Sequence, residues 1–259
     1  MKLSYNAFIQ EIRHLGQFQD LEDDRLQYLE DYLTYFYREM PEYWYNDIAN
    51  IDLPKAVSVV ASLDRMGYFR LTDPGKVNLL KLFYIMGFNE NCFNAEIIWE
   101  EQQLDKRWYV VDGENLIEGG FDDQMKDMRP SFERLGVQIN YRIEWVGDSP
   151  GEGVAYYYVN DHVYSSDFRK ETAPGYSHWD LYGLKFILII NRELELQEVT
   201  ERLYPYCSGN SLAVLILTPE QQAYIQSVTT NPRETPLVIE EWCQLFNVPF
   251  RGYDPQLYF

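Results

Sequence analysis

SLAVLILTPEQQAYI, residues 211–225, is the stretch that decides the fold of the second half of this chain. Its continuous apolar run, Leu212–Leu217, predicts a strand covered on both faces, because a half-exposed strand alternates apolar and polar side chains. Thr218 then ends the strand and can cap a helix, with Pro219 in the first helical position and Gln221 completing a capping box. The stretch therefore predicts a central strand that leads directly into a helix.

A second apolar run precedes it, in KFILIINREL, residues 185–194. Phe186–Ile190 has the same continuous pattern, so we expect a second central strand there. Between the two runs, residues 195–203 place apolar side chains on one helical face and predict a helix. A similar order of strand, helix and strand is expected over residues 107–146, so a duplicated unit is one interpretation of the second half.

The region between these units predicts a hairpin. Residues Val137–Trp145 alternate apolar and polar side chains without exception, which is typical of a half-exposed strand. Turn-forming residues follow, and residues 154–164 can return as the antiparallel partner. Upstream, Phe121–Leu135 is expected to be a helix despite Pro130. Downstream, the sequence predicts a long loop over residues 165–183.

The first hundred residues have helical periodicity. Residues 52–67 and 73–87 each begin with an aspartate and a nearby proline, continue with an apolar face and end at a glycine. A further helix is expected over residues 91–103, and near Leu104 the pattern changes to that of strands. We therefore predict an α+β (mixed α/β) protein. A helical region, residues 1–103, precedes an α/β region, residues 104–259, with a mixed sheet and flanking helices.

The composition favours a well-folded, acidic protein. The chain has 259 residues, of which 46% are hydrophobic, and its formal net charge is −19. A nucleic-acid-binding protein needs a positive surface for phosphate contacts, so this charge argues against nucleic acid as a partner. No apolar run approaches the ~20 residues of a membrane span, no signal peptide is apparent, and the three cysteines form no disulfide pattern. We expect a cytoplasmic protein, and the oligomeric state stays open.

The segment YVVDGENL, residues 109–116, resembles the opening strand of PIN-like and NYN-type metal-dependent ribonucleases. In that family an apolar run is followed by Asp-Gly, one further residue and Asn. The resemblance implies that Asp112 is a metal ligand and that Asn115 is a substrate-binding or turn residue. It covers about eight of the 259 residues.

The rest of the family's pattern is missing from this chain. Several carboxylates must converge on Mg²⁺ or Mn²⁺ for that chemistry, and the later strand that runs into Ser-Gly-Asp has no counterpart. The simpler interpretation is that Asp112 and Gly113 form a turn and that nearby acids favour a helix N-terminus. The sequence therefore predicts no metal site at Asp112, and a metal-dependent nuclease is the alternative function.

Other catalytic and binding motifs are incomplete. His14, His162 and His178 lack the spacing of a zinc site, and we expect His162 on the exposed side of a strand. Cys207 is expected to be a buried, unreactive thiol. Residues 58–73 resemble the recognition helix and wing of winged-helix domains but have few basic residues for DNA. The sequence predicts no catalytic residues, no cofactor and no metal.

Acidic and aromatic residues gather in residues 19–48. In protein recognition, charge steers the encounter and aromatic residues anchor the contact, although a solvated helix start before core aromatics gives the same pattern. We predict a non-enzymatic acidic protein-binding module with a basic protein as partner, for example an inhibitor or an immunity protein against a toxin. The candidate binding residues are Asp20, Glu22, Asp23, Asp24, Tyr43, Trp44 and Tyr45.

Overall fold

The chain divides into two compact units. The computed structural model describes Gln10 and residues 52–88, 93, 97–99, 102–147, 153–167 and 177–259. The first unit comprises Met1–Asn89 and Asn94–Leu104, and the second comprises Glu90–Phe93 and Asp105–Phe259. The division of the chain into residues 1–103 and 104–259 stays a prediction, because most of the first fifty residues lie outside the described ones.

The described part of the first unit is mainly helical, as predicted. Its helical elements are α4 (Leu53–Arg65), η3 (Tyr68–Leu71), η4 (Pro74–Lys76) and α5 (Val77–Met86). Asp52 caps α4 by accepting a hydrogen bond from the Lys55 backbone at 3.1 Å, and Gly87 ends α5. The hydroxyls of Tyr68 and Tyr84 lie 2.9 Å apart in the core of this unit.

The helix predicted over residues 91–103 is wrong where the structure describes it. Ile98–Trp99 (β1) and Gln102–Gln103 (β2) form a short antiparallel pair. The Leu104 backbone N–H also donates to the Ile97 carbonyl at 2.8 Å, which closes this hairpin. Cross-strand hydrogen bonding here overrides the weak helical periodicity of the sequence.

The first sheet of the second unit has the order β3-β8-β7, with β3 Trp108–Val110, β7 Arg202–Tyr206 and β8 Ala213–Leu217. All five residues of β8 are buried, so the prediction of a central, fully covered strand is confirmed. Both neighbours of β8 are antiparallel to it. The α+β class is therefore confirmed, whereas the predicted mixed sheet is wrong.

The second predicted central strand is a helix. Phe186–Ile190 lies in the middle of α8 (His178–Leu196), in which ten consecutive residues, Leu181–Ile190, are buried. A helix covered on all sides has the same continuous apolar run as a buried strand. The helix predicted over residues 195–203 is also wrong, because α8 ends at Leu196 and β7 begins at Arg202. Residues 185–217 therefore do not repeat the order of elements over residues 107–146, and the interpretation as a duplicated unit is wrong.

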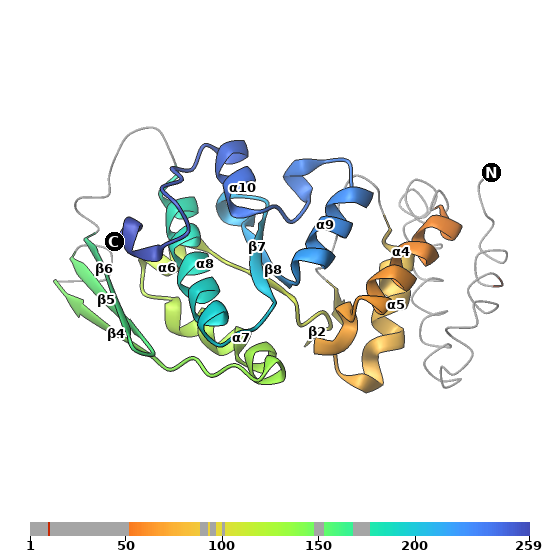
Figure 1. Ribbon diagram of the computed structural model, residues 1–259, viewed down its shortest axis with the longest axis horizontal. Helices are drawn as coiled ribbons and strands as arrows, with labels where there is room; N and C mark the ends of the chain where they lie inside the picture. Colours follow the sequence, from red (N-terminus) through yellow and green to blue (C-terminus); the bar gives the residue numbers. More distant parts are fainter. Residues whose placement is uncertain are drawn as a thin grey trace. The chain divides into compact units, whose positions relative to one another are not determined.

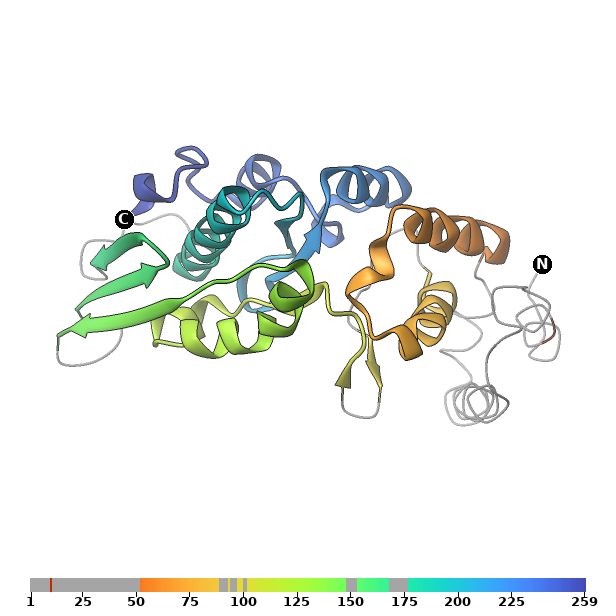
Figure 2. The same cartoon turned by 60° about the horizontal axis from the view of Figure 1, so that its bottom comes forward.

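The other sheet has the order β4-β5-β6, with β4 Tyr141–Val146, β5 Val154–Val159 and β6 His162–Asp167. The predicted antiparallel hairpin is confirmed, except that its first strand begins at Tyr141 and not at Val137. A third strand continues it through the two-residue turn Asn160–Asp161. Asn160 has a φ of 47°, in the left-handed region that asparagine tolerates. In both ribbon views α8 lies between this sheet and strands β7 and β8 (Figures 1 and 2).

Among its described residues, the second unit has four further α-helices. They are α6 (Gly113–Ile117), α7 (Phe121–Leu135), α9 (Pro219–Val228) and α10 (Ile239–Phe246). The capping box of α9 is confirmed by reciprocal hydrogen bonds between Thr218 and Gln221. The last helix begins at Ile239, three residues beyond the predicted Thr235-Pro236 start, because Leu237 donates its N–H to the carbonyl of Pro205 in β7.

The closing segment docks, as its aromatic residues predict. It contains η7 (Pro255–Tyr258), in which Pro255 and Tyr258 are buried. The Tyr258 hydroxyl accepts from the Arg251 N–H at 2.7 Å and donates to the Gly252 carbonyl at 3.0 Å. The segment therefore folds onto its own turn as well as against α8.

Two glycines allow the backbone around α8 to pack closely. A Cβ at Gly113 would lie 2.1 Å from the carbonyl oxygen of Trp179, so only glycine lets α6 reach the first turn of α8. A Cβ at Gly183 would meet a methyl group of Leu212 at 2.2 Å. The glycine of the Asp112-Gly113 pair thus has a packing role.

We predict that Gly113→Ala destabilises the protein by about 1–3 kcal/mol, the usual cost of forcing atoms into a packed site. Chemical denaturation measures this loss. Gly75→Ala is the matched control, because a Cβ there would come no closer than 3.7 Å to the nearest atom. An unchanged free energy of unfolding for Gly113→Ala would contradict the close packing of α6 on α8.

Candidate functional site

The seven predicted binding residues between Asp20 and Tyr45 lie outside the described residues. Their role in partner binding therefore stays a prediction. The described residues hold four other features that bear on function: Asp112, a polar cluster on α8, the outer face of the β4-β5-β6 sheet, and a pocket beside β7.

Asp112 is the N-cap of α6. Its Oδ1 accepts from the backbone N–H groups of Glu114 at 2.9 Å and Asn115 at 3.3 Å. These bonds satisfy donors that a helix start leaves open. The expected turn with a helix start is confirmed, and cap and packing together account for Asp-Gly at this point. Within the described ranges, no group of three or more His, Cys, Asp or Glu side chains is placed to hold a metal ion.

For Asp112 we predict different effects of two substitutions. Asp112→Ala should lower the free energy of unfolding by about 1 kcal/mol, whereas Asp112→Asn should be nearly neutral because asparagine caps equally well. Denaturation of the three proteins measures this, and calorimetric titration with Mn²⁺ accompanies it. Mn²⁺ binding that Asp112→Asn abolishes would instead make the aspartate a metal ligand.

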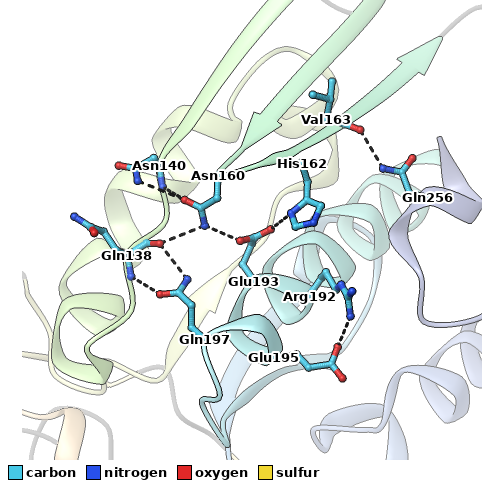
Figure 3. Close-up of polar contacts among 10 residues, drawn as sticks. All are labelled: Gln138, Asn140, Asn160, His162, Val163, Arg192, Glu193, Glu195, Gln197 and Gln256. Atoms are coloured by element: carbon cyan, nitrogen blue, oxygen red, sulfur yellow. Dashed lines mark hydrogen bonds and ion pairs between the residues drawn. The ribbon is translucent and has the colours of Figure 1, made fainter.

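A polar cluster joins α8 to the turn between β5 and β6 (Figure 3). The carboxylate of Glu193, with a side chain only 2% exposed, accepts from Asn160 Nδ2 at 2.6 Å and lies 3.0 Å from His162 Nδ1. His162 was expected on the exposed side of a strand, but it is half-buried on the face toward α8. A carboxylate that orients an imidazole is a geometry that general bases also use. Here the same contacts fix the hairpin turn, and no hydroxyl or thiol is hydrogen-bonded to the imidazole among the described residues.

The cluster continues through amide side chains (Figure 3). Gln197 accepts from the Gln138 N–H at 2.9 Å and donates to its carbonyl at 3.1 Å. Asn160 Oδ1 accepts from the Asn140 N–H at 2.8 Å. On the other side of the hairpin, Gln256 donates to the Val163 carbonyl at 3.0 Å. These bonds occupy backbone groups at the ends of β4 and β6, so they hold the sheet in place on α8.

A second buried charge of α8 faces the same sheet. Lys185 is 2% exposed, and its Nζ donates to Ser166 Oγ at 2.7 Å. The ammonium also lies 4.5 Å from the ring centre of Tyr182 and 4.8 Å from that of Phe259. Aromatic faces stabilise a cation that burial removes from water. Ser166, the partner of Lys185, is itself fully buried.

Asp180 and two cysteines lie near the start of α8. Asp180 is buried and accepts from the Gly209 N–H at 2.7 Å, and burial raises the pKa of its carboxyl. Cys243 is buried, which raises the pKa of its thiol to about 12. Cys207 was expected to be buried but is half-buried, with its carbonyl bound by the Trp242 indole N–H at 2.6 Å.

The raised pKa of Asp180 leads to a pH-dependent prediction. Because folding penalises its ionised form, its favourable contribution to stability is complete below the ordinary pKa and is lost as pH rises through the raised pKa. Asp180→Asn keeps an acceptor for Gly209 but does not titrate. The free energy of unfolding of this variant, minus that of the unaltered protein, should therefore increase with pH across the acid range and then level off. Denaturation at a series of pH values tests this, and a difference that falls with pH would contradict it.

The outer face of the β4-β5-β6 sheet carries tyrosine and valine side chains. Five such residues, none of them buried, lie on this face in neighbouring strand positions: Val146, Val154, Tyr156, Tyr158 and Val163. Tyr158 donates to Glu144 at 2.9 Å, and the Arg142 guanidinium lies 4.1 Å from its ring centre. Arg142 also pairs with Glu144. This outer sheet face is therefore aromatic at its centre, and one of its two tyrosines, Tyr158, is held in place.

A pocket of about 460 Å³ lies beside β7. Four chain segments line it: one face of α8, strand β7, the start of α10 and the turn before η7. Its apolar lining consists of Leu188, Leu203, Val238 and Ile239, and its polar lining of Asn191, Arg192, Glu195, Arg202, Tyr204, Tyr253 and Asp254. Asn191 binds both the N–H and the carbonyl of Leu203, at 2.6 and 3.1 Å, and so protects the edge of β7.

Sequence reasoning missed this pocket and the Glu193 cluster. One local signal for α8 was present: Ser177 and Asp180 have the spacing of a helix cap. With a helix placed there, Leu188, Arg192 and Glu195 fall on one face at steps of three and four. No local pattern joins these residues to Arg202 or Tyr253.

Comparisons with known proteins give no match for this chain, whether with family models, curated proteins or solved structures. Each helix in the described ranges is too short or too polar to cross a membrane. A basic partner and a cytoplasmic location stay predictions.

Proposed function

We propose that this chain is a non-enzymatic, acidic protein-binding module, that its partner is a basic protein, and that the outer sheet face is its contact surface. The observation that carries the proposal is the half-exposed pair Tyr156 and Tyr158, flanked by exposed Val146 and Val163. Tyrosine is enriched at protein interfaces because it combines a large contact area with a polar tip. An antiparallel sheet that faces only water normally has polar residues on that side.

Binding through this face would require little further ordering of its side chains. Tyr158 is restrained by Glu144 and Arg142 before any partner arrives. Side chains that are already ordered lose less entropy on binding. Charged and polar residues at the margins, Arg142, Glu144, Ser165 and Asp167, surround the aromatic centre, which is the usual anatomy of an interface.

Charge favours a basic partner. Residues 105–259 contain 24 acidic and 13 basic residues, a formal net charge of −11, and residues 1–104 contain 17 and 9, a net charge of −8. Exposed acids lie on α6, α7, α9 and α10, for example Glu114, Asp123, Glu220 and Glu240. An acidic field of this extent attracts a basic protein over a distance, and salt screens that attraction.

The proposal predicts that a Tyr156→Thr, Tyr158→Thr double variant loses its partner. Threonine keeps the strand preference and removes the aromatic contact. Proteins captured from native lysate at low and at physiological salt are identified by mass spectrometry for the unaltered protein and the variant. Tyr224→Ala, which removes a half-buried tyrosine from α9, is the matched control.

The outcome that supports the proposal is specific. One protein of net positive charge is retained by the unaltered protein and by Tyr224→Ala, is lost with the double variant, and is captured less at higher salt. The proposal fails if the captured protein is acidic, if it is indifferent to both salt and the double variant, or if no protein is captured.

A further inference from the structure

The pocket beside β7 is lined by Arg202, a cation without an acidic partner among the described residues. Arg202 is half-buried, and its Nη1 donates to the carbonyls of Val199 at 2.5 Å and Glu201 at 2.7 Å. Nη2 and Nε of Arg202 make no hydrogen bond among the described residues, and no described carboxylate lies within ion-pair distance. The Glu201 carboxylate is instead 3.9 Å from Arg107, in a fully buried pair. Two bonds to backbone carbonyls thus hold the guanidinium in place, and Arg202 lines the pocket.

Tyr204 supplies a second open donor in the pocket. The residue as a whole is 8% exposed, and its hydroxyl makes no hydrogen bond to any other described residue. Burial raises the pKa of this hydroxyl, so it stays protonated at neutral pH, although Arg202 nearby acts in the opposite direction. Because Tyr204 lines the pocket, a carboxylate bound there can accept a hydrogen bond from its hydroxyl.

The start of α10 borders the same space. Val238 and Ile239 line the pocket, and Val238, at the N-cap position, offers no side-chain acceptor to the first turn. The open N–H groups and the helix dipole favour a negative group there. The two acids of that turn, Glu240 and Glu241, do not line the pocket, but their negative charges oppose the dipole.

The acids that do line the pocket already have partners. Glu195 pairs with Arg192 at 3.0 Å, on a part of α8 that Figure 3 shows apart from the Glu193 contacts. Asp254 accepts from the Gln256 N–H at 3.0 Å as the cap of η7. Glu195 and Asp254 are exposed residues, whereas Arg202 is half-buried and Tyr204 is buried. The pocket interior therefore offers donors to a ligand and few acceptors.

From these contacts we infer that the pocket binds a carboxylate group carried by a small apolar body. The carboxylate accepts hydrogen bonds from Arg202 and Tyr204 near the start of α10, and Leu188, Leu203 and Ile239 contact the apolar part. A volume of about 460 Å³ suits a ligand of this class. The carboxylate can belong to a free acid or to the end of a peptide chain. This inference is independent of the proposed contact on the outer sheet face.

Two matched probe pairs test the inference by calorimetry and by NMR of the intact chain. The first pair is 4-phenylbutanoate and its uncharged amide, which have the same shape. The second is N-acetylleucine and N-acetylleucinamide, which represent a chain end with and without its carboxylate. We expect 4-phenylbutanoate to bind, with shifts in the signals of Arg202, Tyr204 and Ile239, and its amide to bind about tenfold more weakly or not at all.

Variants then locate the binding. Arg202→Gln should lower the affinity for 4-phenylbutanoate by about tenfold to hundredfold, as expected for loss of a charged hydrogen bond. The affinity for the amide should not change. Tyr204→Phe should lower the affinity for the acid by about tenfold. Because this variant preserves the shape of the pocket, it tests the inference even if Arg202→Gln unfolds. Arg233→Gln, which removes one positive charge outside the pocket, is the control and should change nothing.

The outcomes separate clearly. If N-acetylleucine binds and the same variants abolish its binding, the ligands of the pocket include peptide chain ends. If 4-phenylbutanoate alone binds, the ligands are free acids. The inference is overturned if acid and amide bind alike, if Tyr204→Phe and Arg202→Gln leave the acid's affinity unchanged, or if no acid binds at millimolar concentration.

Discussion

The burial of α8 is the constraint on which the second unit depends. Ten consecutive residues of this helix, Leu181–Ile190, are buried, whereas a helix at a protein surface buries only one stripe. Such a helix needs neighbours on every side, and it contacts α6, β7, η7 and the residues of the β4-β5-β6 sheet. A sheet of three short strands gains stability by packing against a helix. Both sheets use α8 in this way, and Gly113 and Gly183 permit the necessary close approach.

Two buried charges on α8 fix how the β4-β5-β6 sheet sits on it. Lys185 meets Ser166, and Glu193 meets His162 and Asn160. A buried polar group that loses its partner costs about 1–3 kcal/mol, and a charged group costs more. A slip of β6 by one residue would turn His162 and Ser166 to the opposite face of the sheet. The two charges therefore select one pairing register for β6. Apolar residues at the same positions would allow several registers.

The parts of the fold that follow from the sequence are those decided by neighbouring residues. The cap at Thr218 and the alternation from Val137 to Trp145 depend on groups a few positions apart. The cap is present in the structure, and the strand is present from Tyr141 onward. Phe186–Ile190 differs because its apolar run is compatible with a strand and with a helix, provided that either is covered on all sides. What covers it is decided by residues far away in the sequence. Tertiary packing thus determined the element that the local pattern left undecided.

The same distinction applies to the candidate sites. Asp112 caps a helix through its own neighbours, so its local role could be predicted, whereas the pocket joins four separate segments and has no motif. With residues 186–190 as a strand, Leu188 and Arg192 would have no reason to lie beside Tyr204. As a helix, α8 presents every third or fourth residue to β7, and this places its side chains against Arg202 and Tyr204. The pocket therefore follows from the same buried helix that organises the two sheets.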